Sequence, residues 1–163
     1  MTEQNLYGYL DAGYPGQLAS NPHTSIVENG YATEDIPYGH AMALVGGTDA
    51  ADFGESNAFA CELPGSSSEV FGVALGDITQ EQLMDFRGAS EGRRVNILRR
   101  GQVYVSPLSD VLPAGDVHVY ISGSNAGMFT GIADGTNTVE LESSTWLSPK
   151  RTGGVAKVDI QIF

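Results

Sequence analysis

The segment Gly88–Gly92, GASEG, is the nearest approach of this sequence to a catalytic motif. Its spacing, G-x-S-x-G, is that of the nucleophile elbow of α/β-hydrolases, and Asp110 and His118 follow in the chain order of that triad. The elbow needs a buried strand that runs into the serine and a helix that leaves it. Here a polar, helix-like segment precedes Ser90 and an arginine-rich strand follows it. The sequence therefore favours a glycine-rich connection over a nucleophile.

Two groups of carboxylates have spacings that could serve chemistry. Asp49, Asp52 and Glu55 could offer oxygens to calcium, but they lack the order of an EF-hand loop and its distal glutamate. Glu140 and Glu142 lie two residues apart on a predicted strand, so they share a face as paired acids could in a glycosidase. Nothing specifies an opposing carboxylate or a sugar platform. A solvated loop and a wet strand face are the favoured interpretations.

The histidines and the cysteine form no recognisable motif. His23, His40 and His118 are far apart in the chain, and Cys61 is the only cysteine, so neither a zinc pattern nor an intrachain disulfide is available. A phosphate-binding loop is also missing. The sequence therefore predicts a protein that is not an enzyme and that holds no metal and no cofactor.

Arginine is concentrated in one short stretch of an acidic chain. The formal net charge is −12 at pH 7, yet five of the eight basic residues fall within positions 87–100. Residues 1–86 contain thirteen Asp and Glu and no Lys or Arg, whereas residues 87–163 contain eight cations and seven anions. If the two halves occupy different surfaces, the molecule has one acidic face and one nearly neutral face, which suits a soluble protein that orients on a partner. The clustered cations are Arg87, Arg93, Arg94, Arg99 and Arg100.

Three roles are open for this arginine cluster. Nucleic-acid binding is disfavoured because it depends on neutralising phosphates with Lys and Arg, and carboxylates here outnumber cations by twenty to eight. Arginine suits bidentate pairing with carboxylates at protein interfaces. Charged side chains also protect sheet edges from unwanted pairing, and they can pair with the chain's own acids. A protein interface is the favoured role.

Short apolar stretches separated by turn residues predict strands along most of the chain. The 21 Gly and 7 Pro of the 163 residues are scattered without a period. The clearest strand is 155–162, where Ala156, Val158, Ile160 and Ile162 alternate with more polar residues and so form one buried face. The other predicted strands are 39–45, 59–63, 69–75, 95–98, 102–106 and 117–121.

These elements predict an all-β, single-domain sandwich or barrel. Gly101 is expected to break or bulge the sequence between two strands. One short helix is expected over 79–86, where Thr79 begins a capping box. The first thirty residues carry Gly or Pro every few positions and no apolar period, so this segment can order only by lying on the rest of the protein, as an arm or an extended first strand. We take 1–30 as an extended arm and 31–163 as the β domain.

A series of phrases along the chain resembles the structural cement (head decoration) proteins of tailed bacteriophages. The resemblance runs from Tyr7 to Ile162, which is nearly the whole chain. Each phrase alone consists of residues that are common in turns, so the specificity of the resemblance lies in the order of the whole set. The phrases are YGYLDAGYPGQLA, DIPYGHAMA, FGVAL, VNILRRGQVYV, LPAGDVHVYI and GGVAKVDIQI.

The resemblance implies a virion protein without catalysis or cofactor. It implies binding over the joints between major capsid subunits once the shell has formed, a jelly-roll-like β fold, and self-association as a dimer or trimer. With no signal peptide and no apolar run of membrane length, the sequence itself predicts synthesis in a reducing cytoplasm. The expected location is therefore the capsid surface after synthesis in the host cytoplasm, with the major capsid protein as partner and with neither nucleic acid nor membrane.

The candidate capsid-interface residues come from the arginine cluster and from the N-terminal tyrosines. They are Arg87, Arg93, Arg94, Arg99, Arg100, Tyr7, Tyr9 and Tyr14. An alternative is a carbohydrate-binding β-sandwich module on the virion surface, which needs an exposed aromatic platform. The tyrosines available for such a platform are Tyr7, Tyr9, Tyr14, Tyr31 and Tyr38.

Overall fold

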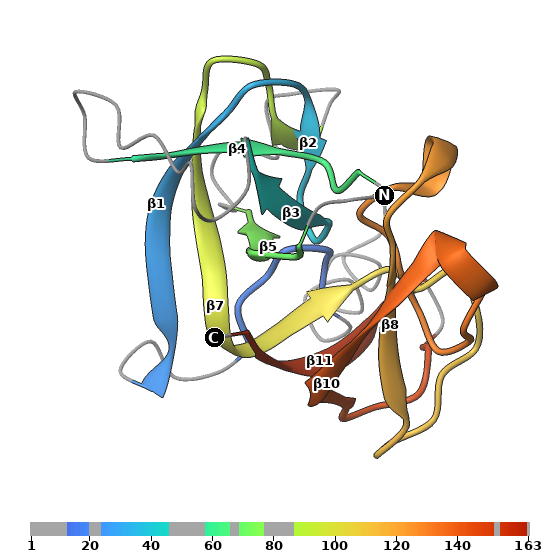
Figure 1. Ribbon diagram of the computed structural model, residues 1–163. Helices are drawn as coiled ribbons and strands as arrows, with labels where there is room; N and C mark the ends of the chain where they lie inside the picture. The colour runs from blue at the N-terminus through green and yellow to red at the C-terminus, as the bar shows by residue number, and fades with distance from the viewer. Residues whose placement is uncertain are drawn as a thin grey trace, which may run out of the picture.

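The computed structural model describes residues 13–19, 24–45, 58–65, 69–76, 87–151 and 154–162 (Figure 1). Strands dominate this part of the chain, and the all-β prediction is confirmed. The strands are β1 (Ile26–Ala32), β2 (Ile36–Pro37), β3 (Ala41–Leu44), β4 (Phe59–Glu62), β5 (Gly72–Leu75), β6 (Gly88–Ala89), β7 (Arg94–Val105), β8 (Asp116–Tyr120), β9 (Phe129–Thr130), β10 (Thr138–Trp146) and β11 (Ala156–Gln161). Two short 3₁₀ turns, Gly123–Asn125 and Gly135–Asn137, complete these elements. The helix predicted over 79–86 lies outside the described residues.

Nine of the strands form one continuous sheet that closes on itself at one end. Its order is β1-β4-β3-β5-β7-β11-β10-β8-β9, and an additional β1–β7 pairing turns the first five strands into a small barrel. The remaining four strands extend from β7 as an open sheet. Figure 1 shows β7 running beside β1 and then turning to follow β11. One long strand therefore belongs to both the barrel and the open sheet, in agreement with the predicted sandwich-or-barrel class.

Gly101 is the point at which β7 passes from one unit to the other. Arg100 still pairs with Ile26 of β1, whereas Gly101 pairs with Ile160 of β11. Gly101 has φ +141°, a conformation that residues with a side chain rarely adopt, so glycine permits the turn within the strand. The sequence predicted two separate strands, 95–98 and 102–106, with a bulge or tight turn at this residue. The predicted end of the strand was wrong, because β7 continues through Gly101, but the backbone is irregular at this residue, as expected.

Two hydrophobic clusters stabilise the two units. Val95 and Ile97 of β7 point into the barrel, where they pack with residues of β3, β4 and β5. A Cβ atom on Gly72 would lie 2.3 Å from Cγ2 of Ile97 and 2.8 Å from the Leu98 carbonyl oxygen, so the barrel closes only around a glycine at this position. The open sheet packs around Trp146, whose ring meets that of Phe129 edge-on at 6.4 Å.

Part of the predicted N-terminal arm belongs to the sheet. The amide of Gly16 donates to the carbonyl of Tyr104 at 2.8 Å, and the amide of Ala19 donates to that of Gln102 at 2.7 Å, so residues 13–19 lie along the second half of β7. β1 begins at Ile26, within the segment that the sequence predicted to be an arm or, alternatively, an extended first strand, without giving the bounds of a strand. Its bounds could not be predicted because the first four residues are exposed and alternation begins only at Gly30.

Burial makes the only cysteine of the chain unreactive in the folded state. Cys61 has no exposed surface, and burial raises the pKa of its thiol to about 12. We expect a thiol reagent at pH 8 to label Cys61 only as fast as the protein unfolds. Because the unfolded thiol ionises first, the free energy of unfolding should also fall above about pH 9, and Cys61→Ala should lack that part of the decline. Rapid, complete labelling of the native protein would contradict this placement.

Candidate functional site

The exposed arginines of β7 form a surface together with β1. Arg94 and Arg100 are exposed, and six residues of extended chain separate them by roughly 20 Å. Arg94 pairs with Tyr31 across the β1–β7 ladder, and Arg100 pairs with Ile26. Side chains of paired residues project to the same side of a sheet, about 5 Å apart. Alternation places Val27, Asn29, Tyr31, Arg94, Asn96 and Arg100 on this side, and exposed Ile26 adjoins it at a register shift opposite Arg100. We call this outward surface the β1–β7 face; it consists of Ile26, Val27, Asn29, Tyr31, Arg94, Asn96 and Arg100.

The β1–β7 face combines cations with exposed apolar area. Ile26 and Val27 are 47% and 43% exposed, and because they are adjacent they form a small apolar patch beside Arg100. Arg93, just before β7, is exposed as well. Within the described part of the chain, Arg93, Arg94 and Arg100 form no ion pair with the protein's own acids. These cations therefore remain available to a partner.

Among the residues that the structure describes, the acidic first half of the sequence and the more basic second half lie side by side where β1 meets β7. β1 comes from the acidic half, yet it lies along β7, which carries three of the five clustered arginines and is immediately preceded by a fourth, Arg93. Glu28 of β1 is close enough to Arg99 to influence its pKa. Where the structure describes both halves, at β1 and β7, acidic and basic residues that are far apart in the sequence are therefore neighbours in space.

Arg99 differs from the other clustered arginines because its guanidinium group is engaged within the molecule. It lies over the ring of Phe71 at 3.9 Å, and Nη2 donates to the Ile162 carbonyl at 3.5 Å. Burial lowers the pKa of Arg99, and the charge of Glu28 opposes that shift. The Nε atom is buried without a hydrogen-bond partner in the described structure. Arg99 thus links β7, the barrel core and the C-terminal strand.

Replacing Arg99 should cost stability that replacing its neighbour does not. We expect Arg99→Ala to lower the free energy of unfolding by about 1–2 kcal/mol, because a partly desolvated cation–π contact and its packing are lost. Arg100→Ala is the matched control, since a surface substitution usually changes stability by less than about 0.5 kcal/mol. Urea unfolding followed by circular dichroism measures both. Equal stability of the two variants would show that the stacking of Arg99 is not structural.

The other predicted interface residues lie away from the β1–β7 face. Arg87 is exposed just before β6, and its carbonyl accepts a hydrogen bond from the amide of Tyr38 at 3.0 Å. Tyr14 is only 4% exposed, so its ring offers little area to a partner. Tyr7 and Tyr9 lie outside the described residues.

The tyrosines predicted to serve a carbohydrate platform are dispersed. Tyr14 and Tyr38 are buried, and only Tyr31 among the described members is partly exposed. Tyr31 lies on the β1–β7 face, opposite Arg94. No exposed aromatic platform is formed by the described residues of this group.

The hydrolase motif is a connection between strands. Gly88 and Ala89 form the two-residue strand β6, and a turn with Gly92 at φ +79° leads from Ser90 directly into β7. No helix follows the serine, so the geometry of a nucleophile elbow is not present. The preference for a glycine-rich connection is confirmed.

The acidic residues considered for a glycosidase or a calcium site are either exposed or lie outside the residues that the structure describes. Glu140 and Glu142 are exposed on β10, and Glu140 pairs with His118 of β8. The calcium candidates at 49–55 lie outside the described residues. Across the described ranges, no group of three or more His, Cys, Asp or Glu could hold a metal ion, and no helix is long and apolar enough to span a membrane.

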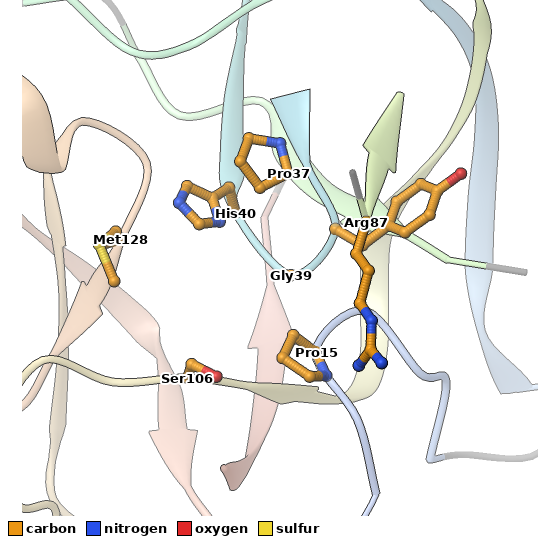
Figure 2. A pocket seen from close by; sticks show the side chains of 8 residues that line it. Pro15, Pro37, Gly39, His40, Arg87, Ser106 and Met128 are labelled. Atoms are coloured by element: carbon orange, nitrogen blue, oxygen red, sulfur yellow. The ribbon is translucent and has the colours of Figure 1, made fainter. Parts of the chain in front are cut away.

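The structure also forms a pocket that the sequence did not reveal (Figure 2). It has a volume of about 200 Å³ and lies where the barrel meets the open sheet. The residues come from five separate segments, which explains why no local pattern pointed to it; the signal in the sequence was only the two turns YPGQ and PYGH. The lining residues are Pro15, Pro37, Tyr38, Gly39, His40, Arg87, Ser106 and Met128.

Comparison with known proteins places this geometry in a family. Residues 3–161 match the family described as structural cement protein (E217 gp24/Pam3 gp6). No curated protein matches the sequence. A similar structure is a chain from "The capsid of Myoviridae Phage XM1", with a TM-score of 0.68 and 13% identity over 91% of this chain and 89% of that one, a likeness that shows a shared fold. With the match extending over nearly its whole length, the chain belongs to the phage structural cement protein family, and its role is structural, in the virion.

Proposed function

We propose that this protein binds the outer surface of the assembled capsid and stabilises the contacts between major capsid subunits, without catalysis. The observation that carries the proposal is the β1–β7 face, on which Arg94 and Arg100 lie beside exposed Ile26 and Val27. Aromatic, aliphatic and arginine side chains together are characteristic of protein interfaces. Because these arginines have no acidic partner among the described residues, carboxylates of a capsid subunit can pair with them.

Stabilisation of the shell follows from differential binding. A protein that contacts two subunits across a joint binds only where both are correctly placed, so it favours the assembled shell over separated or displaced subunits. Once the protein has made one contact with the shell, its other contact surfaces are held close to their binding sites, so each further contact forms at a high effective concentration. Self-association as a dimer or trimer would extend this effect, and the basic face on an otherwise acidic protein would orient it during approach.

Co-sedimentation with empty shells tests the proposal directly. The purified protein is mixed with expanded empty shells of the phage that encodes it, and separately with unassembled major capsid subunits. We expect saturable binding to the shells and much weaker binding to the free subunits, because a joint exists only in the shell. Binding to neither, or equal binding to both, would overturn the proposed role.

We also propose that the beginning of the chain adds to capsid retention, and this can be tested by truncation. Removing residues 1–12 leaves the described segment 13–19 and its hydrogen bonds to β7 in place, so we expect an unchanged unfolding transition but a faster release from shells. Removing residues 1–19 is the comparison, because it also deletes the bonds from Gly16 and Ala19 to β7 and should lower stability. If the shorter truncation leaves the release rate unchanged, the first twelve residues are not part of the interface.

A further inference from the structure

One edge of β1 is open over the first half of the strand. β4 pairs with β1 in parallel only from Gly30 to Ala32, and its first residue, Phe59, lies opposite Gly30. Figure 1 shows β4 reaching β1 at the end that leads to β2, while the rest of β1 runs beside β7. Among the residues that the structure describes, no strand pairs with positions 26–29 on the side away from β7. This part of β1 is therefore a sheet edge.

The hydrogen bonds at the end of β1 show which backbone groups point away from β7. The amide of Ala32 donates to the carbonyl of Arg93 at 2.9 Å, on the side of β7. The amide of the next residue, Thr33, donates to the carbonyl of Cys61 in β4, also at 2.9 Å. Because this direction alternates along a strand, the even-numbered residues of β1 turn their backbone groups toward β7 and the odd-numbered residues turn theirs the other way.

Val27 and Asn29 therefore present backbone groups at the open edge. The register between β1 and β7 is unbroken over positions 27–31, so the alternation extends from Ala32 back to both residues. The amide and carbonyl of Val27 and the amide of Asn29 have no hydrogen-bond partner among the described residues. Such a row of unpaired groups is a template for another strand.

The side chains along this edge do not protect it against pairing. Folded proteins usually guard a sheet edge with Lys, with Pro or with a covering segment, but positions 26–29 read IVEN and all four residues are exposed. Ile26 and Val27 offer apolar area at the edge itself. Glu28, the acid of this segment, projects to the opposite side of the strand from Val27. An edge of this kind is typical of a surface that another chain covers in an assembly.

The neighbouring cation gives the added strand a preferred composition. Arg100 lies opposite Ile26 on β7, is exposed, and forms no ion pair with an acid in the described part of the chain. Neighbouring strands are about 4.8 Å apart, so an added strand would lie about 10 Å from β7. That distance is within the combined reach of an arginine and a glutamate side chain. An extended segment with apolar and acidic residues therefore fits this edge.

We propose that an extended segment of the major capsid protein pairs with the open edge of β1 and continues the sheet by one strand. Backbone hydrogen bonds to Val27 and Asn29 hold the segment, Ile26 packs against one of its apolar side chains, and Arg100 pairs with an acidic one. A second copy of this protein fits less well, because pairing β1 with β1 would bring two cationic β1–β7 faces together. This inference rests on the proposed function, and it names the backbone groups through which the border of the β1–β7 face engages the capsid.

Amide hydrogen exchange tests the pairing on the unmodified protein. Exchange is measured residue by residue by mass spectrometry, on free protein at several concentrations and on protein bound to expanded empty shells. We expect the Val27 and Asn29 amides to exchange at least about tenfold more slowly in the bound state, because each gains a hydrogen bond. The amides of Glu28 and Gly30, which face β7 already, should change much less.

Each other outcome of the exchange experiment has a distinct meaning. If the protein binds shells and the Val27 and Asn29 amides stay unprotected, the strand pairing is wrong and the cement role stands. If these amides become protected in the free protein as its concentration rises, a second copy occupies the edge, and the proposal is also wrong. If the protein does not bind shells at all, the proposed function fails and this inference fails with it.

A proline variant tests the same hydrogen bond by shell binding. Val27→Pro removes an outward amide, and proline is tolerated in edge strands where that amide faces solvent. We expect about fivefold weaker binding to shells, which corresponds to one backbone hydrogen bond. Val27→Thr is the control, because it keeps the amide and the branched shape and should lose less. Circular dichroism checks that both variants fold. Unchanged binding of Val27→Pro, or equal losses in the two variants, would show that this amide is not paired with the capsid.

Discussion

Reversing two charges on the β1–β7 face should lower the affinity for shells by about 100-fold. The change is Arg94→Glu together with Arg100→Glu, both at exposed positions of β7, so we expect the fold to survive. Each substitution removes an attraction to a capsid carboxylate and introduces a repulsion, which at a partly desolvated contact is worth about 1.4 kcal/mol or more. Quantitative co-sedimentation over a range of protein concentrations gives the affinity, and circular dichroism checks the fold.

The matched control changes the same amount of charge elsewhere. Lys150→Glu with Arg151→Glu alters two basic residues that lie between β10 and β11, outside the β1–β7 face. If binding depends on where the cations lie, this variant should retain most of its affinity. An equal loss in both double variants would indicate a general charge effect, and no loss in the β7 variant would remove these arginines from the interface.

Truncating Trp146 should have the largest effect on stability. Trp146 is 1% exposed, packs edge-on against Phe129, and donates from Nε1 to the Asp116 carbonyl at 2.9 Å. Trp146→Ala leaves a cavity and an unpaired carbonyl, and we expect a loss of about 3–5 kcal/mol in the free energy of unfolding. Small domains have only about 5–15 kcal/mol in total, so the variant should be close to its folding threshold.

Its neighbour in the chain provides the control. Leu147 follows Trp146 directly and is 36% exposed, so Leu147→Ala should cost much less. Urea unfolding followed by far-ultraviolet circular dichroism suits both variants, since tryptophan fluorescence is lost in one of them. Similar losses in the two variants would contradict the assignment of Trp146 as the centre of the open-sheet core.

The sequence predicted the regular part of the fold because alternation reports a sheet with one buried face. In β11, Ala156, Val158 and Ile160 are buried and the residues between them are half-buried, as the alternation predicts. β8 follows the same rule through Val117 and Val119. These strands belong to the open sheet, where the same face of a strand packs against the core along its whole length.

The barrel was harder to predict because its strands change environment along their length. In β7, Ile97 and Leu98 are adjacent and both buried, since one points into the barrel and the other toward the second core. β1 shows no alternation before Gly30, so the sequence allowed an extended first strand in this segment but did not mark where it begins. The closing β1–β7 pairing joins residues about seventy positions apart, which no local pattern reports.

The sequence predicted that arginines would take part in the β1–β7 face, but it could not predict how the residues of that face are arranged. The cluster of arginines marked β7 as unusual, and Arg94 and Arg100 are indeed exposed there. The same signal could not distinguish Arg99, because its stacking on Phe71 depends on a contact between distant strands. Exposure of Ile26 and Val27 was also not predictable, since it depends on how β1 sits in the barrel.

A cryo-electron-microscopy reconstruction of shells that carry the protein is the most direct test of the central claim. The account predicts that the β1–β7 face lies against the shell, with Arg94 and Arg100 within about 4 Å of carboxylates from major capsid subunits on either side of a joint. A reconstruction in which that face points to solvent, while another surface contacts the shell, would contradict it.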